Sequence, residues 1–291
     1  MDRVIFGDNQ FFGVNHSSDE KSRVQAIRFK DNQSIIDVLD IAREQGINTF
    51  MCTTHDRIAD ICKTIREDEK YNDFKIYPCM PYAHKYANAV TELGIMGTIK
   101  QYVPGNLFST FAKGGLAFVK KDFTSMMELL IDAEMKMFKG ISTPVIFLQN
   151  VVTDLLLGLG MTDLLVAYYN HIKNKHQAEP GFITMNLPLL LNTLEKNGIQ
   201  NPTICASINK IGFRMSGGVE VYEKVIAEKR CKLIAMQVFA AGAIAPKEAL
   251  EYVCALDGVA SILFGASSQG NIKQSKEIID SLALKTRSNF A

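Results

Sequence analysis

The sequence predicts an α/β fold, a single parallel (β/α)8 barrel, and three observations point to it. Eight short, β-rich apolar runs alternate with segments of helical periodicity. Strict alternation implies parallel strands, because each return to the sheet needs a crossover. The 291 residues are enough for one such barrel, with no linker or repeat to divide residues 1–291. A doubly wound open sheet is the alternative, but no G-x-G-x-x-G motif follows the first run.

The elements follow from these patterns in chain order. The clearest helix covers residues 34–45, where Ile35, Val38, Leu39 and Ala42 share one stripe and Gly46 follows as a stop signal. We expect strands at 4–6, 48–51, 75–77, 144–148, 181–183, 203–205, 232–236 and 260–264. We expect further helices at 57–68, 123–138, 153–175, 188–197, 219–229, 246–256 and 271–283.

One connection, residues 94–122 after the third βα unit, is longer than an ordinary loop. It contains five glycines, one proline and four lysines. Loops beyond about 12–15 residues inside a compact domain are usually functional or disordered. We expect this insertion to be a lid, and a surface insertion that contacts nothing is the alternative.

Composition indicates the compartment and the class of partner. Hydrophobic residues make up 47% of the chain and the net charge is +1, so neither disorder nor a nucleic-acid or membrane partner is indicated. Six scattered cysteines without a C-x-x-C pair indicate reduced thiols. The first residues lack the pattern of a signal peptide, and the longest apolar stretch is too short to span a bilayer. We therefore expect a cytoplasmic protein with a small-molecule substrate, and its oligomeric state stays open.

Polar residues follow the predicted strands, where barrel enzymes carry their chemistry. His55 beside Asp56 is the preferred acid–base pair, because a histidine pKa lies near neutrality. Alternatively, each such histidine only hydrogen-bonds a loop, and we expect His171 and His176 to be solvated on a helix surface. The candidate catalytic residues are His55, Asp56, His84, Tyr82 and Asp8.

The remaining polar strand ends are candidates for binding substrate. Lys210 could form a Schiff base, but contact with an anion or an ion pair is the preferred role. The small residues Gly265, Ala266, Ser267 and Ser268 lead into the last helix, where a phosphate or dinucleotide could bind, unless the serine is only an N-cap. The candidate substrate-binding residues are Gln10, His16, Asn150, Asn186, Asn209, Lys210, Arg214 and Gln237.

A metal site is a further alternative at the barrel mouth. His16, His55 and His84, with Asp8 or Asp56, could supply ligands for Zn²⁺ or Mn²⁺. No local spacing such as H-x-H supports this site, so we assign no metal and favour no cofactor.

Several blocks resemble the aldo-keto reductase superfamily. The run A-R-E-Q-G-I-N-T-F at 42–50 is similar to the family's A-x-x-x-G-I-N-x-F entering the second strand. Residues 182–186 and 202–209 resemble the blocks around strands five and six. Residues 235–244 and 261–274 resemble the A-Y-S-P-L-A-x-G-x-L and V-I-P-G-A-S-S blocks. The similarity covers most of the chain in the family's order and implies the same barrel.

The resemblance does not extend to the reductase tetrad of Asp, Tyr, Lys and His. The family's Asp falls on Met51, its Tyr on the segment 54–56, its Lys near Cys79 or Met80, and its His on Asn150. The tyrosine that stacks on nicotinamide corresponds to Met236, and a later helix Asn to Ser275. Of the cofactor contacts, only Asn186 and the 265–268 turn remain.

These departures favour an enzyme with non-redox acid–base chemistry on a small polar substrate, anionic and carbohydrate-like or phosphorylated. Isomerase, epimerase, lyase and hydrolase stay open. One alternative is a diverged NADP-dependent aldo-keto reductase that takes its acid from His55 or Tyr82. A second alternative is a non-catalytic binding or regulatory barrel.

Overall fold

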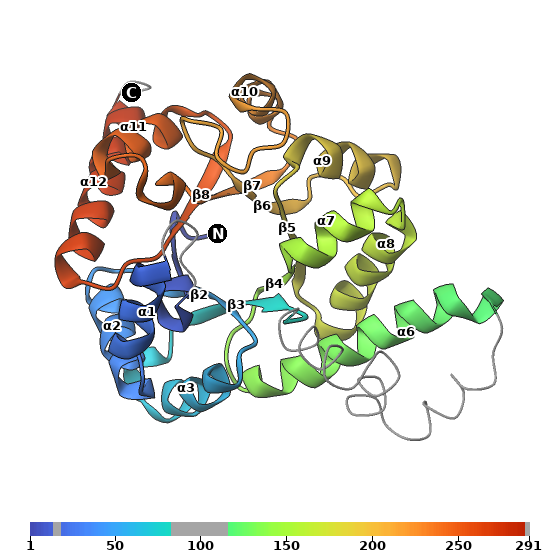
Figure 1. Cartoon of the computed structure of the whole chain (residues 1–291), viewed down its shortest axis with the longest axis horizontal. Helices are drawn as coiled ribbons and strands as arrows, with labels where there is room; N and C mark the ends of the chain where they lie inside the picture. The colour runs from blue at the N-terminus through green and yellow to red at the C-terminus, as the bar shows by residue number, and fades with distance from the viewer. Residues whose placement is uncertain (14–18, 83–115, 289–291) are drawn as a thin grey trace.

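A computed structural model describes residues 1–13, 19–82 and 116–288. It confirms the predicted fold: eight parallel strands close into a barrel in the order β1 to β8. In Figure 1 the strands surround the centre and the helices lie outside them. The strands are β1 (Val4–Gly7), β2 (Thr49–Thr53), β3 (Lys75–Met80), β4 (Val145–Leu148), β5 (Glu179–Thr184), β6 (Thr203–Ser207), β7 (Lys232–Met236) and β8 (Val259–Phe264).

Each described helix follows a strand or precedes the next one. The helices are α1 (Asp19–Arg28), α2 (Asn32–Glu44), α3 (Asp56–Glu67), α6 (Leu116–Met135), α7 (Asn150–Gly158), α8 (Thr162–His171), α9 (Leu187–Lys196), α10 (Val219–Ala227), α11 (Pro246–Ala255) and α12 (Gln269–Ser288). Shorter turns are η1 (Asn9–Phe12), η2 (Glu69–Tyr71), η3 (Lys136–Phe138), η5 (Ala240–Gly242) and the π-helical η4 (Ile172–His176). Among the described residues, no helix has the length and apolar content needed to cross a membrane.

Two expected elements differ from the structure. The helix expected over 153–175 is divided into α7, α8 and η4, because Gly158 and Gly160 interrupt it and Gly160 adopts a positive φ of 67°. Of the insertion expected over 94–122, residues 116–122 belong to the helix α6 instead of a loop, and the lid stays a prediction. Residues 94–115 lie outside the described residues.

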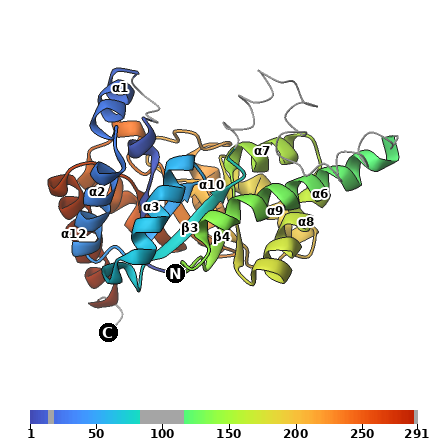
Figure 2. The same cartoon turned by 90° about the horizontal axis from the view of Figure 1, so that it is seen from below.

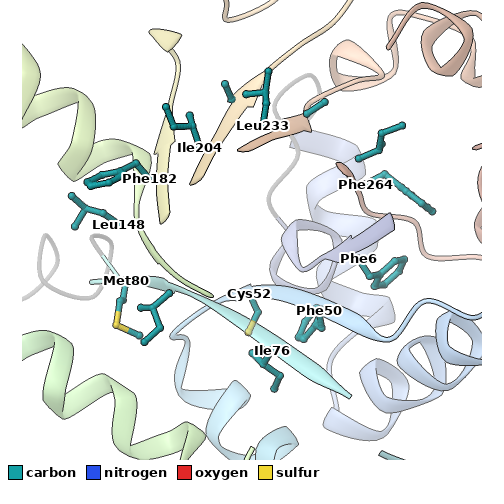
Figure 3. Close-up of a cluster of buried hydrophobic side chains, with 14 of the residues drawn as sticks. Phe6, Phe50, Cys52, Ile76, Met80, Leu148, Phe182, Ile204, Leu233 and Phe264 are labelled. Atoms are coloured by element: carbon teal, nitrogen blue, oxygen red, sulfur yellow. The ribbon is translucent and has the colours of Figure 1, made fainter. Parts of the chain in front are cut away.

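Alternating side chains of each strand build two apolar layers. Outward-facing residues such as Phe50, Leu148 and Phe182 pack between the strands and the helices (Figure 3). Inward-facing residues such as Ile5 and Phe147 fill the barrel interior. The barrel is therefore a packed core, and ligands can reach only its rim.

The first residues of the chain close the barrel against its last strand. Val4 pairs with Ile262, and Phe6 with Phe264. The Ile262 amide donates to the Arg3 carbonyl at 2.9 Å, and the Ser261 hydroxyl donates to the Asp2 carbonyl at 2.6 Å. Backbone and side-chain hydrogen bonds thus join β1 to β8.

Candidate functional site

The carboxyl ends of the strands form a mouth, and the sequence candidates that are described gather there. His16 and His84 lie outside the described residues, so the three-histidine metal site also lies outside them. The mouth has two sides. One side is formed around β1, β2 and β3, and the other around β4 to β7.

Asp8 follows β1 and turns its carboxylate to the end of β2. Its Oδ2 accepts hydrogen bonds from the amide and the hydroxyl of Thr53, at 2.8 and 2.7 Å. Asp8 is buried, and burial raises its pKa although the bonds from Thr53 oppose the shift. Asp8 is therefore a carboxyl group that retains its proton to higher pH than a solvated aspartate.

His55 is the N-cap of α3. Its Nδ1 accepts a hydrogen bond from the Arg57 amide at 3.1 Å, so this nitrogen carries no proton in the capped state. The ring stacks on Phe12 at 4.3 Å between centroids and lies 5.8 Å from the ring of Tyr82. That Asp56 orients this ring stays a prediction.

Glu134, on α6, joins the ends of β2 and β3 and was missed by the sequence analysis. Its Oε2 accepts a hydrogen bond from the Thr54 hydroxyl at 2.5 Å, and both of its carboxylate oxygens lie 3.2–3.3 Å from the Tyr82 amide. Glu134 is buried, as is Thr54. The bond from the Tyr82 amide fixes the backbone that carries the Tyr82 ring at the mouth.

Tyr82 is half-buried on this side of the mouth. Burial, together with the negative charges of Asp8 and Asp56, raises its pKa. Its hydroxyl therefore stays protonated throughout the neutral range and is able to donate a proton. Asp8, Tyr82 and His55, all predicted from the sequence, thus share one side of the mouth.

On the other side of the mouth, several predicted binding residues make hydrogen bonds or ion pairs with other residues of the protein. The Asn209 amide donates to the Phe213 carbonyl and its Oδ1 accepts from the Phe213 amide, both at 2.8 Å, so it closes a loop instead of facing a ligand. Lys210 is exposed and pairs with Glu248 at 2.8 Å, which gives no support to a Schiff base. Gln237 accepts from the Ser207 hydroxyl at 2.8 Å.

An open pocket of about 480 Å³ lies at the ends of β4, β5 and β6. Arg214 contributes to it with a positive φ of 54° and a guanidinium 5.4 Å from the Phe213 ring. Asn186 lies at the end of β5 and caps α9, since its Oδ1 accepts from the Leu189 amide at 3.3 Å. The pocket is lined by Asn150, Met185, Gly212, Arg214, Met215 and Ser216.

The 265–268 turn is held by neighbouring side chains. A Cβ on Gly265 would lie 2.0 Å from Oε1 of Gln10, whose Nε2 donates to the Gly7 carbonyl at 2.7 Å. Ser268 caps α12, because its hydroxyl accepts from the Asn271 amide at 3.3 Å. Arg28 donates to the Ser267 carbonyl. Gln269 and Gly270 begin α12, and the first amides of a helix have no i−4 carbonyl within it and point out past its N-terminus.

Two positions that the resemblance assigns to the family's tetrad, and the position of its nicotinamide-stacking tyrosine, carry buried apolar groups or a thiol. Met51, Cys79 and Met236 all belong to the buried cluster inside the barrel. Burial raises the pKa of the Cys79 thiol well above its ordinary value, so this thiol stays protonated. Asn150 begins α7, and Gln149, which continues the inward alternation of β4 after Phe147, is the buried residue at that strand end.

The comparisons with known proteins agree on the fold. A Pseudomonas aeruginosa protein named as an aldo-keto reductase aligns with 97% of this chain and 90% of its own, at 13% identity and a TM-score of 0.58. The aldo-keto reductase of Bacillus halodurans in its holo form covers 96% and 86%, at 12% identity and 0.55. Aldose reductase from Giardia lamblia covers 96% and 90%, at 10% identity and 0.53. The chain has the aldo-keto reductase-like barrel fold. No family model and no curated protein sequence matches it.

The aldo-keto reductase-like barrel corrects the main functional prediction. The non-redox acid–base reaction expected from the sequence is wrong, because the solved structures that resemble the chain are named as reductases, which are oxidoreductases. The absence of the tetrad suggested a change of reaction, but a tetrad can be lost while the mouth keeps other proton donors. At the mouth of this barrel, burial raises the pKa of two protonatable groups, the Asp8 carboxyl and the Tyr82 hydroxyl.

Proposed function

We propose that the protein is a diverged NADP-dependent aldo-keto reductase that converts a carbonyl compound into an alcohol. The likeness to named reductases over 97% of the chain carries this proposal. The mouth supports it, because Tyr82 offers a protonated hydroxyl beside the buried carboxyl group of Asp8.

The residues of this chain are compatible with a dinucleotide. The amides of Gln269 and Gly270 and the guanidinium of Arg28 offer donors to a phosphate group beside the 265–268 turn. The pocket that contains Asn150 and Arg214 offers room at the ends of β4, β5 and β6. The dinucleotide, when bound, supplies the hydride.

Tyr82 is our proposed proton donor. The carbonyl carbon accepts the hydride, and the carbonyl oxygen takes the proton of the Tyr82 hydroxyl, which gives an alcohol and a tyrosinate that solvent reprotonates. Tyr82 is more accessible than Asp8, which is buried against Thr53. Glu134 and the ring of His55 act as positioning groups, through the Tyr82 amide and the packing at 5.8 Å.

Binding and turnover of NADPH test this proposal separately. We expect calorimetry to detect NADPH binding, and absorbance to show NADPH oxidation with members of a panel of aldehydes and ketones. Absence of NADPH binding at millimolar concentration contradicts the proposed function.

Tyr82→Phe then tests the proton donor. This variant should retain NADPH binding and lose about 10²-fold or more in kcat. Tyr169→Phe is the matched control, because Tyr169 lies on α8 with Lys173 over its ring, outside the mouth. Full turnover by Tyr82→Phe overturns the role of Tyr82 and leaves the reductase proposal intact.

A further inference from the structure

Two histidines and an aspartate converge on the outer wall of the barrel, away from the mouth. Asp132 lies near the end of α6, His171 ends α8, and His176 ends η4. Asp132 Oδ1 is 2.9 Å from Nε2 of His171 and also 2.9 Å from Nε2 of His176. The sequence predicted that both histidines are solvated, but their side chains are only 8% and 15% exposed.

The π-helical turn η4 explains why these two histidines face the same way. Residues five apart on an α-helix point roughly 140° apart, at about 3.6 residues per turn. A π-helix closes its hydrogen bonds between residues i and i+5, which brings side chains at this spacing close to one line. The rings lie 5.4 Å apart at 69°, so they do not stack, and their Nε2 atoms both meet Asp132.

We infer that Asp132, His171 and His176 form a binding site for a divalent transition-metal ion of the Zn²⁺ class. The three ligand atoms lie within 4.8 Å of one another. Two imidazole nitrogens and one carboxylate oxygen are a donor set that suits Zn²⁺, Ni²⁺ or Cu²⁺ better than Mg²⁺ or Ca²⁺. Three protein ligands leave a coordination position for solvent. This inference does not depend on the proposed reductase function.

The neighbours of the three residues match the surroundings of a metal ligand. A histidine that binds metal through Nε2 commonly donates its Nδ1–H to a carboxylate. Glu128 Oε1 lies 3.7 Å from Nδ1 of His171, on the side away from Asp132. Lys175 lies 2.7 Å from the other oxygen of Asp132, Oδ2, and leaves Oδ1 to the two histidines.

Charge at the cluster also favours a cation. The carboxylates of Asp132 and Glu128 lie at the cluster, and the ammonium of Lys175 contacts the one on Asp132. Nε2 of each histidine must lose its proton to bind the ion, and metal binding would therefore release protons.

The position of the cluster indicates a structural role for the ion. Barrel helices run antiparallel to the strands, and the cluster lies at the ends of α6 and α8, just before β5 begins. It is therefore at the end of the barrel opposite the mouth, where residues serve stability. In Figure 1 and Figure 2, α6 and α8 lie side by side on the outer wall, so an ion would tie two helices together.

Calorimetric titration with ZnCl₂ tests this site, using the full chain without an affinity tag, stripped with EDTA and kept reduced. We expect one ion per chain and a thermal midpoint that rises with ZnCl₂. His176→Gln and Asp132→Asn should each weaken binding at least about tenfold. Asp257→Asn, at an exposed carboxylate that pairs with Lys229, is the matched control and should bind as the wild type does.

Two outcomes overturn the inference. The first is no saturable binding by the wild type, in which case Asp132 only accepts hydrogen bonds from the two imidazoles. The second is binding that both variants retain, in which case the ion is held elsewhere, for example by cysteines. Replacing Zn²⁺ with Co²⁺ distinguishes the proposed ligands from cysteine ligands, even if one variant fails to fold. The proposed ligands give visible d–d bands without the thiolate charge-transfer band that cysteine ligands would add.

Discussion

Glu134→Ala should destabilise the protein more than any ordinary surface change. The carboxylate accepts from the Thr54 hydroxyl at 2.5 Å and from the Tyr82 amide at 3.2–3.3 Å. Glu134 is 5% exposed and Thr54 is 0% exposed, so water cannot replace the lost acceptor at Thr54. Each buried donor left without a partner costs about 1–3 kcal/mol. With the Tyr82 amide only partly buried, we expect a loss of about 2–4 kcal/mol in the free energy of unfolding.

Urea denaturation followed by circular dichroism measures this loss, with thermal denaturation as a second measurement. The expected fall in Tm is roughly 4–10 °C. Glu134→Gln keeps one acceptor oxygen and should lose about half as much. Glu67→Gln, at an exposed position on α3, is the control and should change stability by less than about 0.5 kcal/mol. If Glu134→Ala costs less than about 1 kcal/mol, Glu134 does not hold the two strand ends together.

Two further predictions concern the pH dependence and the barrel interior. Burial raises the pKa of Asp8 in the native state above 3.8, so the native state binds the carboxyl proton more tightly than the unfolded state does. The contribution of Asp8 to stability therefore falls as pH rises from 3.8 through the native pKa. Asp8→Asn should therefore become progressively more stable than the wild type as pH rises from 4 upwards, and a constant difference between their urea midpoints would contradict burial as the cause. In Gly181→Ala, the new Cβ would lie 2.4 Å from the Phe147 ring, so we expect a loss of about 1–3 kcal/mol. Phe147→Leu should offset part of that loss in the double variant, and strict additivity in denaturation would disprove the clash.

Strands and helices could be predicted from the sequence where a single apolar pattern covered the whole element. The strand expected at 232–236 is found as β7 with the same ends, because charge and turn residues bound a single apolar run. The turn η1 and helix α1 were missed, since the segment that contains them carries few apolar residues at helical spacing. The division of α7 from α8 depended on Gly158 and Gly160, which sequence reasoning noted as interruptions of an apolar stretch but not as a helix boundary.

The candidate site was predictable in position but only partly in role. In a barrel, the end of each strand is also close to the start of a helix, so residues chosen as helix caps occupy the places where catalytic residues are sought. Asn186, Ser268 and His55 all proved to be caps. Glu134 could not be found, because it reaches the mouth from a helix about 80 residues after Thr54 and follows no strand. Likewise, the pairing of His171 with His176 depends on a π-helical turn, which the periodicity of an α-helix does not indicate.

The pairing of β1 with β8 determines when this protein can finish folding. During synthesis β1 is made first and can pair with β2 soon afterwards, but its other edge has no partner until residues 259–264 have left the ribosome. That edge carries Val4, Ile5 and Phe6 and stays open while most of the chain is translated, which exposes it to pairing with other nascent chains. Because the last contact closes a loop of more than 250 residues, barrel closure is the step that a chaperone would protect.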